Sequence, residues 1–190
     1  MSQISKPIAL DASVMLNLAA TDSPMRILSL VGSAITVDEA AQELVRNPRT
    51  RRPVSSLSDV GLDGVVVVKL GPEERVVMHR FSSPPHDLDD GEAAVIAHAH
   101  VHGLTMYSDD KRAYKVAKRV GLSVKISSTV DLFRVAAEVL KEKELSDMVY
   151  DALRFARMGV VSLEDAKWVA DLIGRERASE CYSLPAKVRG

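Results

Sequence analysis

The feature that most constrains the fold is the alternation of short apolar runs with longer helix-like segments. The runs lie at 7–10, 33–37, 65–68, 104–107 and 123–126. Strands joined by helical crossovers normally pair in parallel, and helices then cover both faces of the sheet. We therefore predict an α/β three-layer sandwich around a central, mainly parallel five-stranded sheet.

Two helices are predicted after the last strand. In the first, apolar residues recur at offsets of three and four, at Leu145, Met148, Val149, Ala152, Leu153 and Ala156. Gly159 supplies a stop for this helix, and Ser162 begins a Ser-Leu-Glu-Asp sequence that favours an N-cap. The inward face of the second helix would be Ala166, Val169, Ala170 and Ile173. This pattern predicts a C-terminal helical pair at about 144–178.

The chain is predicted to form one domain, 1–190, with its core at about 7–140. Proline, glycine and serine are concentrated at 47–64 and 82–85, which we predict to be surface loops too short to separate domains. A length of 190 residues with 46% apolar content is enough to bury a sizeable core.

Charge and cysteine content exclude several classes of protein. Lys and Arg number 25 against 26 Asp and Glu, so the chain is not a uniformly basic nucleic-acid binder, and any polyanion site must be local. The single cysteine, Cys181, excludes a disulfide framework and a cysteine-built metal site. No apolar run is long enough to span a membrane, and the first residues lack a secretory signal pattern, so we expect a cytoplasmic protein.

Acidic residues follow the predicted strands. Asp11 comes directly after one apolar run, and Asp109 and Asp110 come just after another, while Glu43 and Glu92 lie on predicted helices. Ligands of an open parallel sheet gather beyond the carboxyl ends of its strands, so these side chains should converge. Mg²⁺ and Mn²⁺ prefer oxygen ligands of this kind. The pattern favours a metal site suited to phosphodiester hydrolysis.

Each acid also has a simpler explanation. Asp11 can cap the next helix, and Glu92 closes an Asp-Asp-Gly-Glu sequence that is a variant of a capping box. Glu43 alone would be a solvated surface residue. The adjacent Asp109 and Asp110 repel each other, which favours a nearby cation or basic partner. The set as a whole, rather than any member, supports the metal site.

The residues resemble the PIN-domain nucleases, which include the ribonuclease toxins of toxin–antitoxin pairs. The first block is Asp11-Ala12-Ser13 after a strand, and the second is Glu43-Leu44 on a helix. The third, 88–99, is similar to a leucine, Gly-Glu and alanine-rich helix of one branch of the family, and the fourth is Ser108-Asp109-Asp110-Lys111-Arg112. The resemblance spans roughly 8–139.

The resemblance implies that one or two Mg²⁺ or Mn²⁺ ions bind the catalytic carboxylates Asp11, Glu43, Glu92 and Asp110. Asp109 would be a further metal ligand, and Ser13 and Ser108 would support the site. The implied activity is that of an endoribonuclease that leaves a 5′-phosphate, and the implied partners are RNA, an antitoxin protein and a second copy of the chain.

Two alternatives stay open. The first is a non-catalytic PIN-like module that binds RNA or protein. The second is a phosphotransferase similar to the haloacid dehalogenases, although such enzymes usually have Asp-x-Asp where this chain has Ser13. The apolar faces of the last helices and of 14–30 would suit a homodimer or an antitoxin groove, and core burial explains them equally well.

RNA contacts are predicted from local basic residues, for which a solvated surface is the competing explanation. The candidates are Lys111, Arg112, Lys115, Lys118 and Arg119 after Asp110, and Arg49, Arg51 and Arg52 in the 47–64 loop. An aromatic content of 4% argues against an extended base-stacking platform.

Three histidines, His98, His100 and His102, lie late on the predicted Glu92 helix. His98 and His102 are one helical turn apart, as metal ligands can be, but the neighbouring sequence offers no third ligand for a zinc set. We therefore predict a surface position at the helix end.

Overall fold

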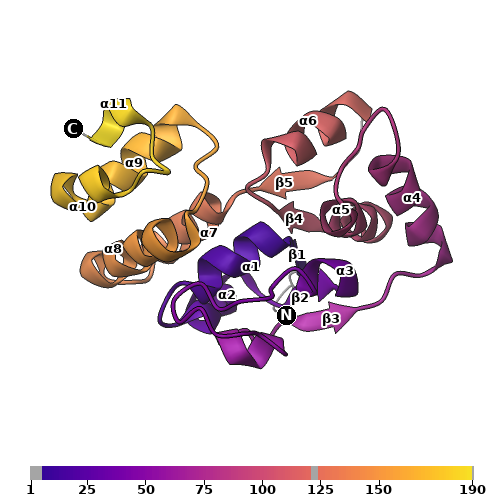
Figure 1. Ribbon diagram of the computed structural model, residues 1–190, viewed down its shortest axis with the longest axis horizontal. Coiled ribbons are helices and arrows are strands. Elements are labelled where there is room, and N and C mark those ends of the chain that lie inside the picture. Colours follow the sequence, from indigo (N-terminus) through magenta and orange to yellow (C-terminus); the bar gives the residue numbers. More distant parts are fainter. Residues whose placement is uncertain (1–5, 121–123, 190) are drawn as a thin grey trace, which may run out of the picture.

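The computed structural model describes residues 6–120 and 124–189 and contains a five-stranded sheet in which every pairing is parallel. The strand order is β3-β2-β1-β4-β5 (Figure 1). The strands are β1 (Ile8–Leu10), β2 (Ala34–Val37), β3 (Val66–Val68), β4 (Thr105–Tyr107) and β5 (Lys125–Ser127). Each predicted run thus contains a strand, although Ser123 of the last run lies outside the described residues.

Helices cover both faces of this sheet, which confirms the three-layer α/β sandwich. Figure 1 shows α1 (Ala12–Ala19), α2 (Pro24–Val31) and α7 (Thr129–Ala137) on one side, and α3 (Asp38–Ala41), α4 (Pro72–Ser82) and α5 (Asp90–His102) on the other. The remaining crossover helix, α6 (Lys111–Val120), joins β4 to β5.

The helix α5 is the most deeply buried helix of the second face. Every residue from Gly91 to Ala99 is buried, and the helix packs against β1, β2, β4, α3 and α4. Its alanines let the backbone approach the sheet closely. On the other face, the apolar residues of 14–30 that would have suited a partner are largely core, including Val14, Met15, Leu18, Ile27 and Leu28.

The C-terminal helices follow the prediction with two corrections. Helix α8 (Glu142–Asp151) continues as a π-helix, η2 (Ala152–Ala156), which ends at Arg157 with φ of 57° rather than at Gly159. The left-handed Arg157 turns the backbone so that the Met158 N–H donates to the Ala152 carbonyl at 3.1 Å, which closes the helix early. The chain also ends in two short helices that were not predicted, α10 (Arg175–Glu180) and α11 (Ala186–Arg189).

The second predicted helix, α9 (Leu163–Ile173), agrees with its pattern. The Asp165 N–H donates to Ser162 Oγ at 3.0 Å, as an N-cap requires, and all four predicted inward residues are buried. The 47–64 loop contains a short 3₁₀ helix, η1 (Leu57–Val60). Within the described part of the chain, no helix has the length and apolarity that crossing a membrane would require.

Candidate metal centre

Acidic side chains from several elements meet beyond the carboxyl ends of β1 and β4. The two strands are neighbours, and the Asp11 N–H donates to the Tyr107 carbonyl at 3.0 Å. Asp11 and the 108–110 segment therefore leave the sheet side by side. A cavity of about 180 Å³ opens there and is lined by Asp11, Ala12, Ser13, Leu16, Glu43, Asp89, Glu92 and Asp110.

Two serines fix the carboxylates that follow the strands. Asp11 is 5% exposed, and its Oδ2 accepts hydrogen bonds from Ser13 Oγ at 2.6 Å and from Ser108 Oγ at 3.0 Å. Ser108 Oγ also accepts the Asp110 N–H at 3.1 Å. One serine thus links the two aspartates, an arrangement suited to the supporting role expected of Ser13 and Ser108.

Glu92 lies in the first turn of α5 and is 3% exposed. The cap of this helix is Asp89, whose Oδ1 accepts the Glu92 N–H at 2.8 Å. The Glu92 carboxylate is thereby free of capping, and its Oε1 is buried with no hydrogen-bond partner among the described residues. Asp89, and not Glu92, is therefore the residue that caps α5, and the Glu92 carboxylate remains available to bind a ligand in the cavity.

Glu43 reaches the cavity because Gly91 lacks a side chain. A Cβ at Gly91 would lie 1.9 Å from Glu43 Oε1 and 3.3 Å from the Ala40 Cα. The chain just after α3 therefore crosses close to the start of α5, with the Glu43 carboxylate over the glycine. This explains in physical terms why glycine precedes the acid in the Gly-Glu pair.

Burial, with neighbouring charges added to it, shifts the pKa values of these acids upward. Burial raises the pKa of Glu92 to about 8, with the charges of Asp110, Asp11 and Asp89 adding to the shift and Arg112 opposing it. Partial burial and then the charges of Asp89 and Asp11 raise the pKa of Glu43 to about 7. Burial also raises the pKa of Asp11. The site accordingly favours bound protons or a cation over bare negative charge.

Asp109, which precedes Asp110 in the chain, is not among the residues that line the cavity. Its Oδ1 accepts the Thr129 N–H at 2.8 Å, and its Oδ2 accepts from Thr129 Oγ1 and Asn17 Nδ2, each at 2.6 Å. Burial raises its pKa to about 6. Asp109 thus links α1 to α7, and its role as a metal ligand stays a prediction. The Asp110 side chain is bonded to a different group, because its Oδ1 accepts the Arg112 N–H at 2.6 Å.

Asp89 is the cavity residue that sequence reasoning did not include in the metal set. The Asp-Asp-Gly-Glu sequence marked the start of α5 correctly. The capping residue, Asp89, also lines the cavity, because this end of the helix faces it. The available signal was its spacing of one turn before Glu92, which puts both acids at the same helix end.

The predicted RNA-contact residues fall into two groups. Lys111, Arg112 and Lys115 are exposed on α6 directly after Asp110, and the Arg112 N–H donates to Asp110 Oδ1 at 2.6 Å. Lys118 and Arg119, farther along α6, are exposed as well. The second group lies in the 47–64 loop, where Arg51 and Arg52 are exposed.

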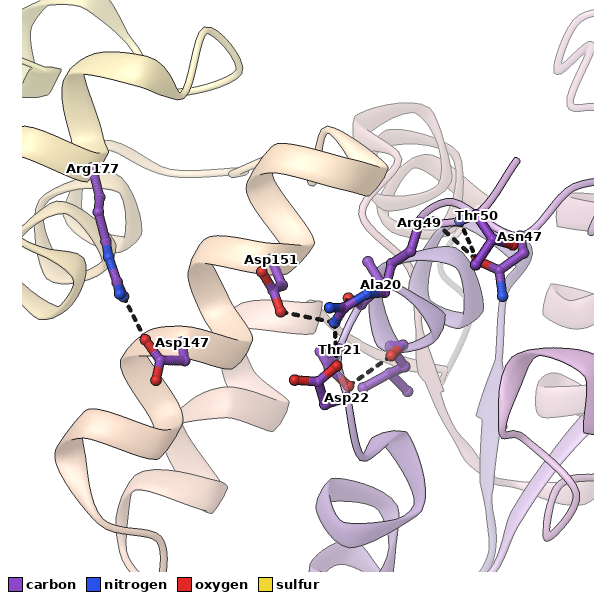
Figure 2. A network of polar contacts seen from close by, with 10 residues as sticks. Ala20, Thr21, Asp22, Asn47, Arg49, Thr50, Asp147, Asp151 and Arg177 are labelled. Carbon is purple, nitrogen blue, oxygen red and sulfur yellow. Dashed lines mark hydrogen bonds and ion pairs between the residues drawn. The ribbon is translucent and has the colours of Figure 1, made fainter. Parts of the chain in front are cut away.

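Arg49 has a different environment from the other predicted RNA-contact residues. Figure 2 shows its guanidinium between Asp22 and Asp151, at 2.5 and 2.9 Å. This placement ties the loop to other elements of the fold.

The surface position predicted for the three histidines is wrong for His98. This residue is buried at 8% exposure, and its Nδ1 bonds to Glu74 Oε1, which comes from α4. His102 Nε2 lies 3.1 Å from the same oxygen. The third ligand group that the neighbouring sequence lacked is therefore supplied by another helix.

Comparison with known proteins agrees with this geometry. No curated protein matches the chain. A family model described as a PIN domain matches residues 7–138, which is more than half of the chain and includes every residue lining the cavity. The chain therefore belongs to the PIN-domain family.

Proposed function

We propose that this PIN-domain protein is a metal-dependent ribonuclease, with Mg²⁺ or Mn²⁺ bound by Asp11, Glu43, Glu92 and Asp110. PIN domains are generally nucleases. The observation that carries the proposal is the buried Glu92 Oε1, which has no partner among the described residues in a cavity lined by four other carboxylates. A buried polar atom without a partner is costly, and a divalent cation would satisfy it.

The donor set fits a hard cation. Among the described residues, the charged groups lining the cavity are all carboxylates, and no histidine or cysteine lines it. Oxygen-only sites suit Mg²⁺ and Mn²⁺, which keep several of their waters. With about 30 Å³ per water molecule, a cavity of about 180 Å³ has room for a cation and part of its hydration shell.

The side chains have separate tasks in this proposal. Asp11 is held in one orientation by Ser13 and Ser108, so it forms the fixed part of the site. Glu43 lies at the exposed rim, and because its pKa is about 7 without metal, binding of the cation there would release a proton near neutral pH. A bound cation supplies acidified water and neutralises charge on the phosphate.

RNA would approach along α6. Lys111 and Arg112 directly follow Asp110 and are exposed, so they are placed to attract phosphates toward the cavity.

The products expected from the family resemblance are a 5′-phosphate and a 3′-hydroxyl. An antitoxin partner and a homodimer also remain proposals from that resemblance, and light scattering with size-exclusion chromatography measures the second directly.

The test is a nuclease assay on a pool of cellular RNAs and on matched single-stranded DNA, with Mn²⁺ alone and with excess chelator. We expect RNA cleavage that the chelator abolishes and that Asp11→Asn reduces at least about 10-fold, because a lost ligand costs no less than an outer-shell partner. Full metal-dependent cleavage by a folded Asp11→Asn variant would rule out this site. RNA binding without cleavage by the unmodified protein would favour the non-catalytic module.

A further inference from the structure

A second group of metal-ligating side chains lies at the opposite end of α5 from the carboxylate cavity. It comprises Glu74 from α4 and His98 and His102 from the last turns of α5. One ligand atom of each residue lies within 4.8 Å of the others. At 1.5 Å of rise per residue, His102 is about 15 Å along the helix from Glu92, so the group is separate from the proposed nuclease site.

The arrangement of the three ligand atoms is close to that of a coordination shell. Glu74 Oε1 lies 3.1 Å from His102 Nε2 and contacts His98 Nδ1. Ligand atoms at about 2.1 Å from a tetrahedral zinc ion lie about 3.4 Å apart, so a slight separation of Glu74 and His98 makes room for the ion. The two imidazole rings are 4.4 Å apart between centroids and tilted by 47°, which lets both nitrogens face the same carboxylate.

Burial differs among the three side chains in a way that suits metal entry. Glu74 and His98 are 9% and 11% exposed in their side chains, whereas His102 is 49% exposed. Two ligands are therefore held in place by packing, and the third lies on the solvent side. A site of this form has an entry path and an open position for water.

Both carboxylate oxygens of Glu74 have defined partners. Oε1 contacts His98 Nδ1 and lies 3.1 Å from His102 Nε2. The Gly71 N–H, at the start of α4, donates to the other carboxylate oxygen, Oε2. Oε1 is therefore the oxygen that faces the histidines.

We propose that Glu74, His98 and His102 form a zinc-binding site that joins α4 to α5. Two imidazoles and one carboxylate suit Zn²⁺, in contrast to the oxygen-only cavity at the other end of the helix. Because α5 also carries Glu92, metal binding here would stabilise the helix on which the proposed nuclease site is built. The inference does not depend on nuclease activity.

The test measures binding of Zn²⁺, and of Co²⁺ as its spectroscopic probe, to the full chain after chelator treatment and dialysis. Intense visible absorption of Co²⁺ reports four-coordinate binding with nitrogen ligands, which an oxygen-only, water-rich site does not give. We expect one such site in the unmodified protein and in Glu92→Gln. We expect His102→Ala to weaken Zn²⁺ binding by at least about 10-fold, the lower range for losing even an outer-shell partner.

His102→Ala is the main variant because this residue is half exposed, so the fold should tolerate it. His79→Ala is the matched control, since His79 is an exposed histidine on α4 outside the cluster. The proposal is supported if His79→Ala binds Zn²⁺ and Co²⁺ as the unmodified protein does. It is overturned if the unmodified protein gives no four-coordinate Co²⁺ spectrum, or if His102→Ala retains that spectrum with unchanged affinity.

Discussion

At the residue scale, Asp89 and Glu92, three positions apart at the start of α5, have different tasks: one caps the helix and the other faces the cavity. Asp89 accepts the Glu92 N–H and caps α5, while Glu92 presents a buried oxygen to the cavity. Asp89→Asn separates the two contributions of the capping residue, because asparagine caps as well as aspartate but carries no charge.

We expect Asp89→Asn to lower Mn²⁺ affinity several-fold while the melting temperature changes little, since the cap is kept and one negative charge is lost from the cavity. Calorimetric titration with Mn²⁺ and thermal unfolding measure the two effects. Asp90→Asn is the control, because Asp90 is exposed in the same turn and does not line the cavity. Equal losses in both variants would mean that general helix-end charge, rather than the cavity, sets the affinity.

Glu92 gives the metal-free protein a specific dependence of stability on pH. Its pKa is about 8 in the folded chain and near 4.5 in the unfolded chain, so between these values the folded state holds a proton that the unfolded state has released. The free energy of unfolding should therefore fall as pH rises through this window. Above pH 8 the full cost of the buried charge is present.

Glu92→Gln should remove that cost. We expect the variant to be more stable than the unmodified protein at pH 8, by on the order of 4 kcal/mol, and within about 1 kcal/mol of it at pH 5. Denaturant unfolding in chelator at both pH values measures the difference. Glu73→Gln, a change of an exposed acid in the first turn of α4, should alter stability by the same small amount at both pH values. A stability gain of the same size at pH 5 would show that charge burial is not its cause.

At the element scale, the close crossing of α5 and the segment after α3 depends on Gly91. Gly91→Ala would place a Cβ against the Glu43 carboxylate and near the Ala40 backbone, so Glu43 must leave the cavity. Alanine also raises helix propensity by about 1 kcal/mol, which offsets part of the steric cost. We expect a folded protein with at least about 10-fold weaker Mn²⁺ binding and reduced cleavage.

Gly159→Ala is the matched glycine control for this experiment. A Cβ at Gly159 would meet only ordinary contacts, the nearest being the Asp109 carbonyl oxygen at 3.9 Å. Titration with Mn²⁺ and circular dichroism on both variants separate loss of the site from loss of structure. Unchanged metal affinity in Gly91→Ala would show that the Glu43 position over Gly91 is not needed for binding.

The elements were largely predictable because their signals are local. Strand positions follow from apolar runs, and the starts of α5 and α9 follow from capping residues. The π-helix η2 was not predictable, because it keeps the apolar spacing of an α-helix until its last turn. Directions of side chains were harder still. The bonds of Asp109 to Asn17 and of His98 to Glu74 join residues far apart in the chain, and no local pattern reports them.

At the scale of the whole molecule, the C-terminal helices are fastened to the PIN core through the 47–64 loop. The Arg49 guanidinium bonds to Asp151 of α8 and to Asp22 and the Ala20 carbonyl after α1 (Figure 2). It also stacks on the Phe155 ring, at 5.1 Å from its centroid. A single arginine therefore connects three parts of the chain that are distant in sequence.

Farther along the C-terminal region, Arg177 of α10 pairs with Asp147 of α8 at 2.7 Å, as Figure 2 also shows. The helices beyond the match to the family model are thus joined to one another as well as to the core. Together with the packing of η2 on α1, these contacts make the region an integral part of the fold.

We expect Arg49→Ala to lower the free energy of unfolding by about 1–3 kcal/mol, because it removes a partly buried pairing and leaves Asp151 without its cation. Hydrogen exchange should rise first in 142–156, the segment that Arg49 holds. Arg52→Ala, a change of an exposed arginine in the same loop, should alter neither quantity. If Arg49→Ala instead weakens RNA binding while stability and exchange stay unchanged, this arginine contacts substrate, and the C-terminal helices are held by other contacts.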